Sequence, residues 1–123
     1  MDARLRKGIR LFNAGQFFAA HEVLEELYLE TREKQDKPFL EGIIELSVAI
    51  RLFCDFGDVD GPVRMIRQAL VRLENYSPRY LRVKVNDLIQ ALEEWTQQAK
   101  AGANAHPSAS KGIPKILLSR SFF

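Results

Sequence analysis

Residues 38–56 read PFLEGIIELSVAIRLFCDF, and the expected architecture is built around this segment. Its apolar residues recur every three or four positions, which predicts a helix from about Pro38 to Phe56. Two apolar stripes share the helix: Phe39, Ile43, Leu46, Ile50 and Phe53 line one side, and Ile44, Val48 and Leu52 line the opposite side. A helix that is apolar on two sides is expected to be buried. The segment therefore predicts a central helix with other helices packed around it.

Two amphipathic helices are predicted on the N-terminal side of the central helix. Apolar residues at helical spacing place them at about residues 4–13 and 16–31, with Gly15 as the break between them. A charged loop follows, in which Asp36 is expected to cap the central helix. Gly42 costs about 1 kcal/mol relative to alanine inside that helix, so we expect it to permit a close crossing by a neighbouring helix.

Two more helices are predicted on the C-terminal side. The first begins near Pro62 and ends at Tyr76-Ser-Pro. The second is capped by Asn86 and stopped by Gly102. The predicted fold class is therefore all-α: a compact bundle of about five helices, whose first hairpin resembles the helix hairpin of tetratricopeptide repeats.

Length and composition are those of one soluble globular domain. The chain has 123 residues, of which 46% are hydrophobic and 28% charged, and these values exclude a disordered chain, a collagen and a disulfide scaffold. Cys54, the single cysteine, suits a reducing compartment and is interpreted as a core thiol rather than a nucleophile. No apolar run approaches the ~18 residues of a membrane helix, and the first residues do not resemble a signal peptide. We therefore expect a cytoplasmic protein without a membrane partner.

Three parts are expected along the chain. Residues 1–101 form the helical bundle domain. Residues 102–110 contain Gly, Ala, Asn, His, Pro and Ser, a composition typical of a flexible linker. Residues 111–123 are apolar and basic but too short to fold alone, so we expect a C-terminal docking arm. The arm is expected to dock on its own domain, with a neighbouring subunit or another protein as the alternative.

Charge is segregated along the chain. Residues 22–60 contain eleven acidic and four basic residues, whereas residues 64–84 contain six basic and one acidic residue. This segregation either holds the acidic helices against the basic one or creates a bipolar surface that orients a partner or a second copy. Nucleic acid is not an expected partner, because the net charge is only +2 and no aromatic residues interleave the arginines.

The candidate for chemistry is the segment His21-Glu-Val-Leu-Glu25. His21 and Glu25 are four residues apart and share one helix face at the edge of the core, while Glu22 points further toward water. The segment resembles the start of the zinc-protease signature His-Glu-x-x-His, but a glutamate stands in place of the second histidine. One histidine and one glutamate are too few ligands for zinc unless Glu41 or Glu45 joins them.

Glu45 lies on the second apolar side of the central helix, where a lone buried carboxylate is costly. It needs a partner or a raised pKa, and the candidate partners are His21, Arg51 and Arg67. Two interpretations stay open: a buried polar network that ties two helices together, or a pocket for a metal ion or a general base. That pocket would use His21, Glu25, Glu41 and Glu45.

Residues 12–28, FNAGQFFAAHEVLEELY, resemble the signature of the small helical proteins grouped as domain-of-unknown-function family 309. Residues 39–50 resemble the second block of that family. The resemblance implies a compact all-α bundle, typical of bacteria, archaea or plastids, with no established activity. The family motif places Asn13 beside a centre formed by His21, Glu22 and Glu25.

The chain departs from the family pattern at three places. Tyr28 stands where tryptophan is usual, Glu41 and Glu45 stand where glutamine is common, and Arg51-Leu52 stands where members often carry histidines. The last change removes potential metal ligands, whereas the two glutamates make the region more anionic.

We therefore expect a non-enzymatic helical module that acts through protein–protein contact or self-association, in the cytoplasm, or in the plastid stroma of a plant. No cofactor is expected. A polar cluster would then brace the bundle, and its members are Asn13, His21, Glu22, Glu25, Glu41 and Glu45. The alternative is a metal-dependent or acid–base enzyme that uses His21, Glu25 and Glu45.

Overall fold

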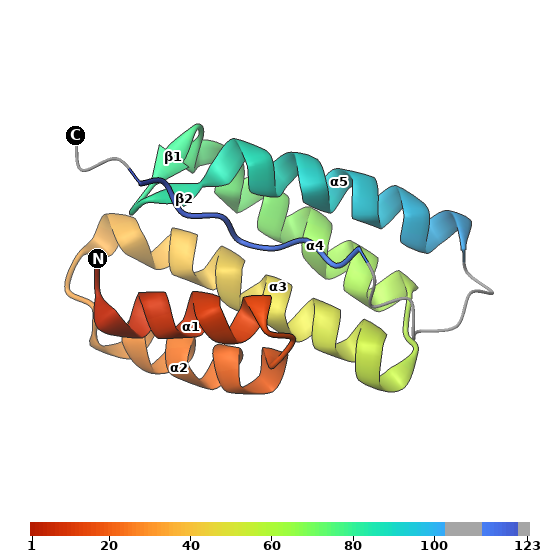
Figure 1. Ribbon diagram of the computed structural model, residues 1–123, viewed down its shortest axis with the longest axis horizontal. Coiled ribbons are helices and arrows are strands. Elements are labelled where there is room, and N and C mark those ends of the chain that lie inside the picture. Colours follow the sequence, from red (N-terminus) through yellow and green to blue (C-terminus); the bar gives the residue numbers. More distant parts are fainter. Residues whose placement is uncertain (103–111, 121–123) are drawn as a thin grey trace.

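The computed structural model describes residues 1–102 and 112–120, and over these residues the chain is mostly helical (Figure 1). The helices are α1 (Ala3–Asn13), α2 (Phe17–Glu30), α3 (Lys37–Phe56), α4 (Asp60–Leu73) and α5 (Val85–Ala101). Single 3₁₀ turns cover Lys34–Asp36 and Glu74–Tyr76, and a short hairpin joins β1 (Arg79–Tyr80) to β2 (Val83–Lys84). The predicted all-α class is confirmed.

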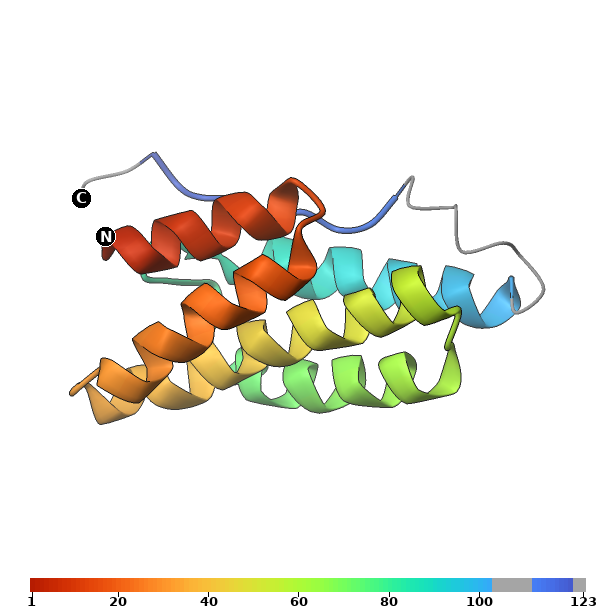
Figure 2. The ribbon, with the colours of Figure 1, turned by 90° about the horizontal axis from the view of Figure 1, so that it is seen from below.

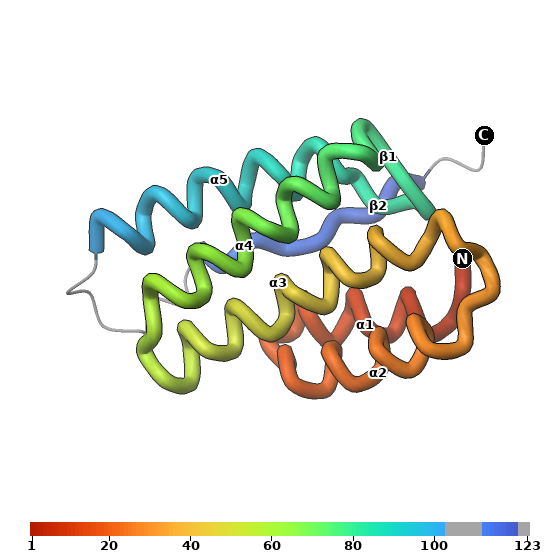
Figure 3. The backbone as a smooth tube through the Cα atoms, turned by 180° about the vertical axis from the view of Figure 1, so that it is seen from behind, coloured from red at the N-terminus to blue at the C-terminus, as the bar shows by residue number. Residues whose placement is uncertain are grey.

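The elements form two layers. One layer contains α2, α3 and α4, with α3 between the other two, as the view from behind shows (Figure 3). The other layer contains α1 and α5, with the extended segment 112–120 running between them (Figures 1 and 2). The first apolar stripe of α3 faces this second layer, and its members are all buried: Phe39, Ile43, Leu46, Ile50 and Phe53. The predicted central position of α3 is therefore correct for this stripe.

Close packing between α3 and α4 requires the glycine in α3. A Cβ atom at Gly42 would lie 3.1 Å from the side chain of Leu73 and 3.7 Å from the carbonyl oxygen of Ala69, both on α4. Most Cβ contacts are looser than the first of these distances, so the absence of a side chain brings the two helices together. The predicted close crossing is confirmed.

The second apolar stripe of α3 is not buried as expected. Ile44, Val48 and Leu52 are only half-buried, because they point away from the layer of α1 and α5. At 100° per residue, Val48 lies about 200° around the helix from the fully buried Leu46. The helix is thus central within its own layer, and it presents an apolar edge on the outside of that layer.

Three local expectations were wrong. The hairpin was not predicted, because its two-residue turn is Leu81-Arg82 rather than the Asn-Gly type that marks such turns; both residues have positive φ, 48° and 70°. The last helix begins directly after β2, at Val85, so Asn86 lies inside its first turn instead of capping it. Asp36 precedes α3 but makes no capping hydrogen bond; its carboxylate accepts a hydrogen bond from the hydroxyl of Tyr80 instead.

The C-terminal segment lies against its own domain. Leu118 forms a bridge with Val83, the amide of Ser119 donates to the carbonyl oxygen of Arg82 (2.8 Å), and Ile116 is buried in the core. Residue 111 and residues 121–123 of the expected arm, and residues 103–110 of the expected linker, lie outside the described residues. Among the described helices, none combines the length and the apolar character that crossing a bilayer requires.

Candidate functional site

The predicted polar cluster is divided over three places, two of which meet at one groove. Asn13 binds the C-terminal segment, His21 pairs with Glu25 on α2, and Glu41 and Glu45 pair with Arg72 between α3 and α4. Glu22 is exposed. The first of these places belongs to the layer of α1 and α5, and the other two lie on the outside of the layer of α2, α3 and α4.

Asn13 holds an extended backbone. Its side-chain amide donates to the carbonyl oxygen of Ile116 (2.9 Å) and accepts from the amide of the same residue (2.8 Å). The pair of hydrogen bonds copies the contact between two β-strands and is independent of the side chain at position 116. Asn13 is therefore a structural anchor for the C-terminal segment, 103 residues away in the chain.

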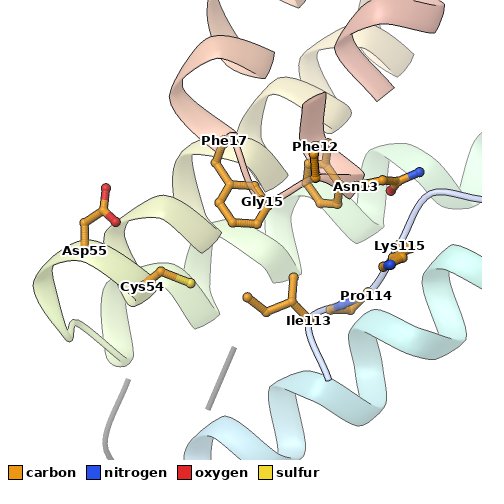
Figure 4. Close-up of a pocket in the computed structure, with 10 residues that line it drawn as sticks. Phe12, Asn13, Gly15, Phe17, Cys54, Asp55, Ile113, Pro114 and Lys115 are labelled. Carbon is orange, nitrogen blue, oxygen red and sulfur yellow. The ribbon is translucent and has the colours of Figure 1, made fainter. Parts of the chain in front are cut away.

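Asn13 also borders a cavity of about 390 Å³ at the turn between α1 and α2 (Figure 4). The cavity is lined by motif residues of the first hairpin, by the end of α3 and by the C-terminal segment, namely Phe12, Asn13, Ala14, Gly15, Phe17, Cys54, Asp55, Ile113, Pro114 and Lys115. Burial, with a smaller effect of Asp55, raises the pKa of the Cys54 thiol. The thiol is therefore protonated at neutral pH and a poor nucleophile, although Cys54 is half-buried at the edge of the core rather than inside it.

His21 and Glu25 contact each other along α2, with 2.7 Å between Nε2 of the histidine and a carboxylate oxygen of the glutamate. The pair lies at the edge of the core, where the helical spacing placed it. The ring of Phe18 lies next to His21, and the guanidinium group of Arg51 on α3 stacks 4.5 Å above the same ring. These contacts fix one outer edge of α2 against α3.

Glu45 has a different partner from those expected. Arg72 on α4, and not His21, Arg51 or Arg67, pairs with it and also lies 3.5 Å from a carboxylate oxygen of Glu41. The hydroxyl of Tyr28 on α2 donates to the other oxygen of Glu41 (2.6 Å), and this hydrogen bond is the main reason why the pKa of Tyr28 is raised. Tyr28, Glu41, Glu45 and Arg72 thus form one network, here called the Arg72 network, across three helices.

The two acidic groups do not combine into one metal site. Over residues 1–102 and 112–120, no three histidine, cysteine or acidic side chains lie close enough together to hold a metal ion. His21 and Glu25 contact each other, whereas Glu45 pairs with Arg72. Glu25, Glu41 and Glu45 nevertheless line one groove, so the structure brings three of the four predicted pocket residues to one place without His21 and without a set of metal ligands.

What the arrangement does form is a continuous outer surface, here called the outer face. It comprises the half-buried stripe of α3 (Ile44, Val48, Leu52), the outward side of α2 (Phe18, His21, Glu22, Glu25, Leu29) and the outward side of α4 (Arg64, Met65, Gln68, Arg72). Two of its apolar side chains are markedly exposed, Phe18 at 47% and Leu29 at 71%. A groove of about 390 Å³ lies on it, lined by Glu25, Tyr28, Leu29, Glu41, Ile44 and Glu45.

The sequence contained a signal for part of this surface. Phe18 and Leu29 stand off the main apolar stripe of α2, so their position on a helical wheel already indicates exposed apolar residues. Arg72 carried no such signal, because its pairing depends on the relative height of two helices. The Arg72 network was therefore missed.

Comparison with known proteins gives a family but no activity. The sequence matches, over residues 5–65, the family model of a domain of unknown function, DUF309. An uncharacterised protein of Aquifex aeolicus (strain VF5) is 26% identical over 90 residues, which are 73% of this chain and 27% of that protein. The chain thus spans about a quarter of the length of this relative.

Proposed function

Because the chain belongs to the DUF309 family, whose description states no activity, we propose its function from its geometry: it is a protein–protein contact module that binds through the outer face. The observation that carries this proposal is the apolar stripe of Ile44, Val48 and Leu52. These residues lie one turn apart along α3 and are half-exposed. Apolar side chains at this spacing on a helix edge are typical of a surface that another protein covers.

The neighbouring residues extend the same apolar strip. Phe18 and Leu29 flank it on α2 and are among the most exposed large apolar residues of the described chain, and Met65 flanks it on α4. A contiguous exposed apolar patch with a polar rim is the usual mark of a protein contact site. Here the rim is supplied by Glu22 and Glu25 on one side and by Arg64 and Gln68 on the other.

The polar groups near the strip support contact rather than chemistry. Both carboxylates of the Arg72 network already accept hydrogen bonds or ion pairs, and Glu25 is paired with His21. Their role in this arrangement is to hold α2, α3 and α4 in one layer. A rigid layer loses little conformational freedom on binding, which favours association.

The opposite layer offers less room for a partner. The space between α1 and α5 is occupied by the C-terminal segment, whose Pro114 and Ile116 are buried (Figure 2). The outer face carries the half-buried stripe of α3 together with the exposed Phe18 and Leu29, whereas Met1, Leu81 and Leu117 are exposed on other parts of the described chain.

Site-specific photo-crosslinking tests the proposal. A benzophenone amino acid replaces Leu52 in one variant and Leu117 in a matched control; Leu117 is 49% exposed but lies in the C-terminal segment, in the layer of α1 and α5. We expect irradiation of purified protein or of cell extract to give a defined protein adduct at position 52 and none at position 117. Equal adducts at both positions, or none at either, would contradict the proposal.

A further inference from the structure

We propose that the partner of the outer face is a second copy of this chain, and that the two copies pack face to face about a two-fold axis parallel to α3. This inference rests on the proposed function above, and it names both the partner and its orientation. It is carried by the order of the helices within the layer and by the placement of charge on the two helices that flank α3.

The order of helices limits the possible pairings. Since α3 lies between α2 and α4 (Figure 3), a two-fold axis parallel to α3 places α2 of one copy over α4 of the other, on both sides of the axis. A two-fold axis perpendicular to α3, within the same interface, places α2 over α2 and α4 over α4 instead. In either case the apolar stripe of α3 meets its own copy in the middle.

Charge distinguishes these two axes. On α2, Glu25 lines the groove together with Ile44, Glu22 lies about 60° around the helix from it, and both are exposed. The other two glutamates of the helix, Glu26 and Glu30, face α1, where Arg4 pairs with them. On α4, Arg64 is exposed and lies about 80° around the helix from Arg72, on the side away from Ala69; Arg72 is the residue that reaches Glu41 and Glu45 of α3. The axis parallel to α3 therefore brings opposite charges together, whereas the perpendicular axis opposes like charges, which disfavours association.

Glu22 and Arg64 also lie at similar heights, which here means similar positions along the axis of α3. Tyr28 of α2 and Arg72 of α4 both contact Glu41, so these two positions are level. Both α2 and α4 run antiparallel to α3, so equal steps along them keep two level positions level. Six residues before Tyr28 and Arg72 are Glu22 and Ile66, and Ile66 is only two residues from Arg64. Two residues are about 3 Å along a helix, and rotation about an axis parallel to α3 preserves height. Glu22 of one copy thus comes within reach of Arg64 of the other.

Neither of these two residues is used within its own copy. In the part of the chain that the structure describes, Glu22 and Arg64 form no ion pair.

The outer face is also large enough for a specific interface between two copies. Flanking helices of 14 residues are about 21 Å long and three helices about 9 Å apart span about 27 Å, so each copy covers about 600 Å². Two such surfaces reach the lower limit of specific interfaces, about 1,200 Å² in total.

Charge exchange between the flanks tests the inference. The first variant carries Glu22→Lys and Glu25→Lys, which makes both flanks basic. The second, the exchanged variant, adds Arg64→Glu and Gln68→Glu, so that α2 becomes basic and α4 acidic. All four positions are exposed, and circular dichroism melts establish that each variant is folded. The oligomeric state is measured by sedimentation velocity at low salt, and mixtures with a mass-tagged wild-type chain are measured by native mass spectrometry.

The proposed axis predicts a specific pattern. We expect the wild type to dimerise, the basic variant to bind itself at least about tenfold more weakly, and the exchanged variant to recover a wild-type dissociation constant. The exchanged variant is also expected to exclude the wild type, because both pairs of flanks then repel each other. High salt is expected to reduce these differences.

The contrary outcomes are distinct from each other. Preferential heterodimers between the exchanged variant and the wild type would overturn the proposed axis in favour of the perpendicular one. Dimers that are insensitive to all these charges would overturn the pairing of α2 with α4. A wild type that stays monomeric, while position 52 still crosslinks to another protein, would overturn the second copy as partner and leave the proposed function intact.

Discussion

Replacing Asn13 by alanine removes the anchor of the C-terminal segment. The side-chain amide of Asn13 makes two hydrogen bonds with the backbone of Ile116, at 2.9 and 2.8 Å, and Ile116 is buried. Alanine leaves one N–H and one C=O of this buried residue without their partners, since the methyl group cannot replace either contact.

The expected loss of stability follows from these two hydrogen bonds. A hydrogen bond of this kind contributes about 1 kcal/mol net, so we expect Asn13→Ala to lower the free energy of unfolding by about 2 kcal/mol. For a domain of this length, a change of that size corresponds to a fall in melting temperature of about 6–10 °C.

Chemical denaturation and amide hydrogen exchange measure the two parts of this prediction. Exchange of the Ile116 amide is expected to accelerate more than that of amides in the middle of α3, because the segment opens locally before the bundle unfolds. Gln16→Ala is the matched control, since Gln16 is an exposed polar residue near the same turn whose side chain makes no capping hydrogen bond. Equal stability of Asn13→Ala and the control, with unchanged exchange at Ile116, would refute the assignment of Asn13 as an anchor.

Two further predictions concern the core and the hairpin. Gly8→Ala is expected to destabilise the domain by about 1–3 kcal/mol in thermal unfolding, despite the better helix propensity of alanine. The reason is that the new Cβ would lie 2.5 Å from the fully buried side chain of Leu24. Unchanged stability would contradict this prediction, because it would show that α1 and α2 can move apart freely. Burial, helped by Asp36, raises the pKa of Tyr80. A raised pKa keeps the phenol neutral in the folded state, so the stabilisation is present below the ordinary tyrosine pKa of about 10 and is lost as pH rises above it. The free energy of unfolding, measured at a series of pH values, is therefore expected to fall less above about pH 10 for Tyr80→Phe than for the wild type. The same fall in both proteins would contradict this prediction.

The helices were predictable from the sequence because their signals are local. Apolar spacing and flanking glycines located α1, α2 and α3 to within a few residues, and Gly42 indicated the close approach of α4. The hairpin was not predictable in the same way, since Leu81 and Arg82 adopt positive φ without the glycine or asparagine that usually announces it.

The candidate site was only partly predictable because it depends on contacts between helices. The pair of His21 and Glu25 follows from the spacing of four residues along one helix, and the structure forms it. The partner of Glu45 could not be derived, because Arg67 and Arg72 lie about 140° apart around α4. Both the height and the rotation of α4 relative to α3 therefore decide which of them faces Glu45. The same limit explains why two apolar stripes on α3 suggested burial on both sides, when only one side is covered.

Sedimentation equilibrium of the full chain, from micromolar to near-millimolar concentration, compares the wild type with Val48→Glu and with Leu117→Glu. Val48 lies in the middle of the apolar stripe of α3, whereas Leu117 is an exposed leucine of the C-terminal segment, in the opposite layer. We expect the average mass of the wild type and of Leu117→Glu to rise from that of one chain toward that of two, while Val48→Glu stays at the mass of one chain and keeps its helical content. A dimer that forms equally well with glutamate at position 48 would contradict the outer face as the contact surface between copies.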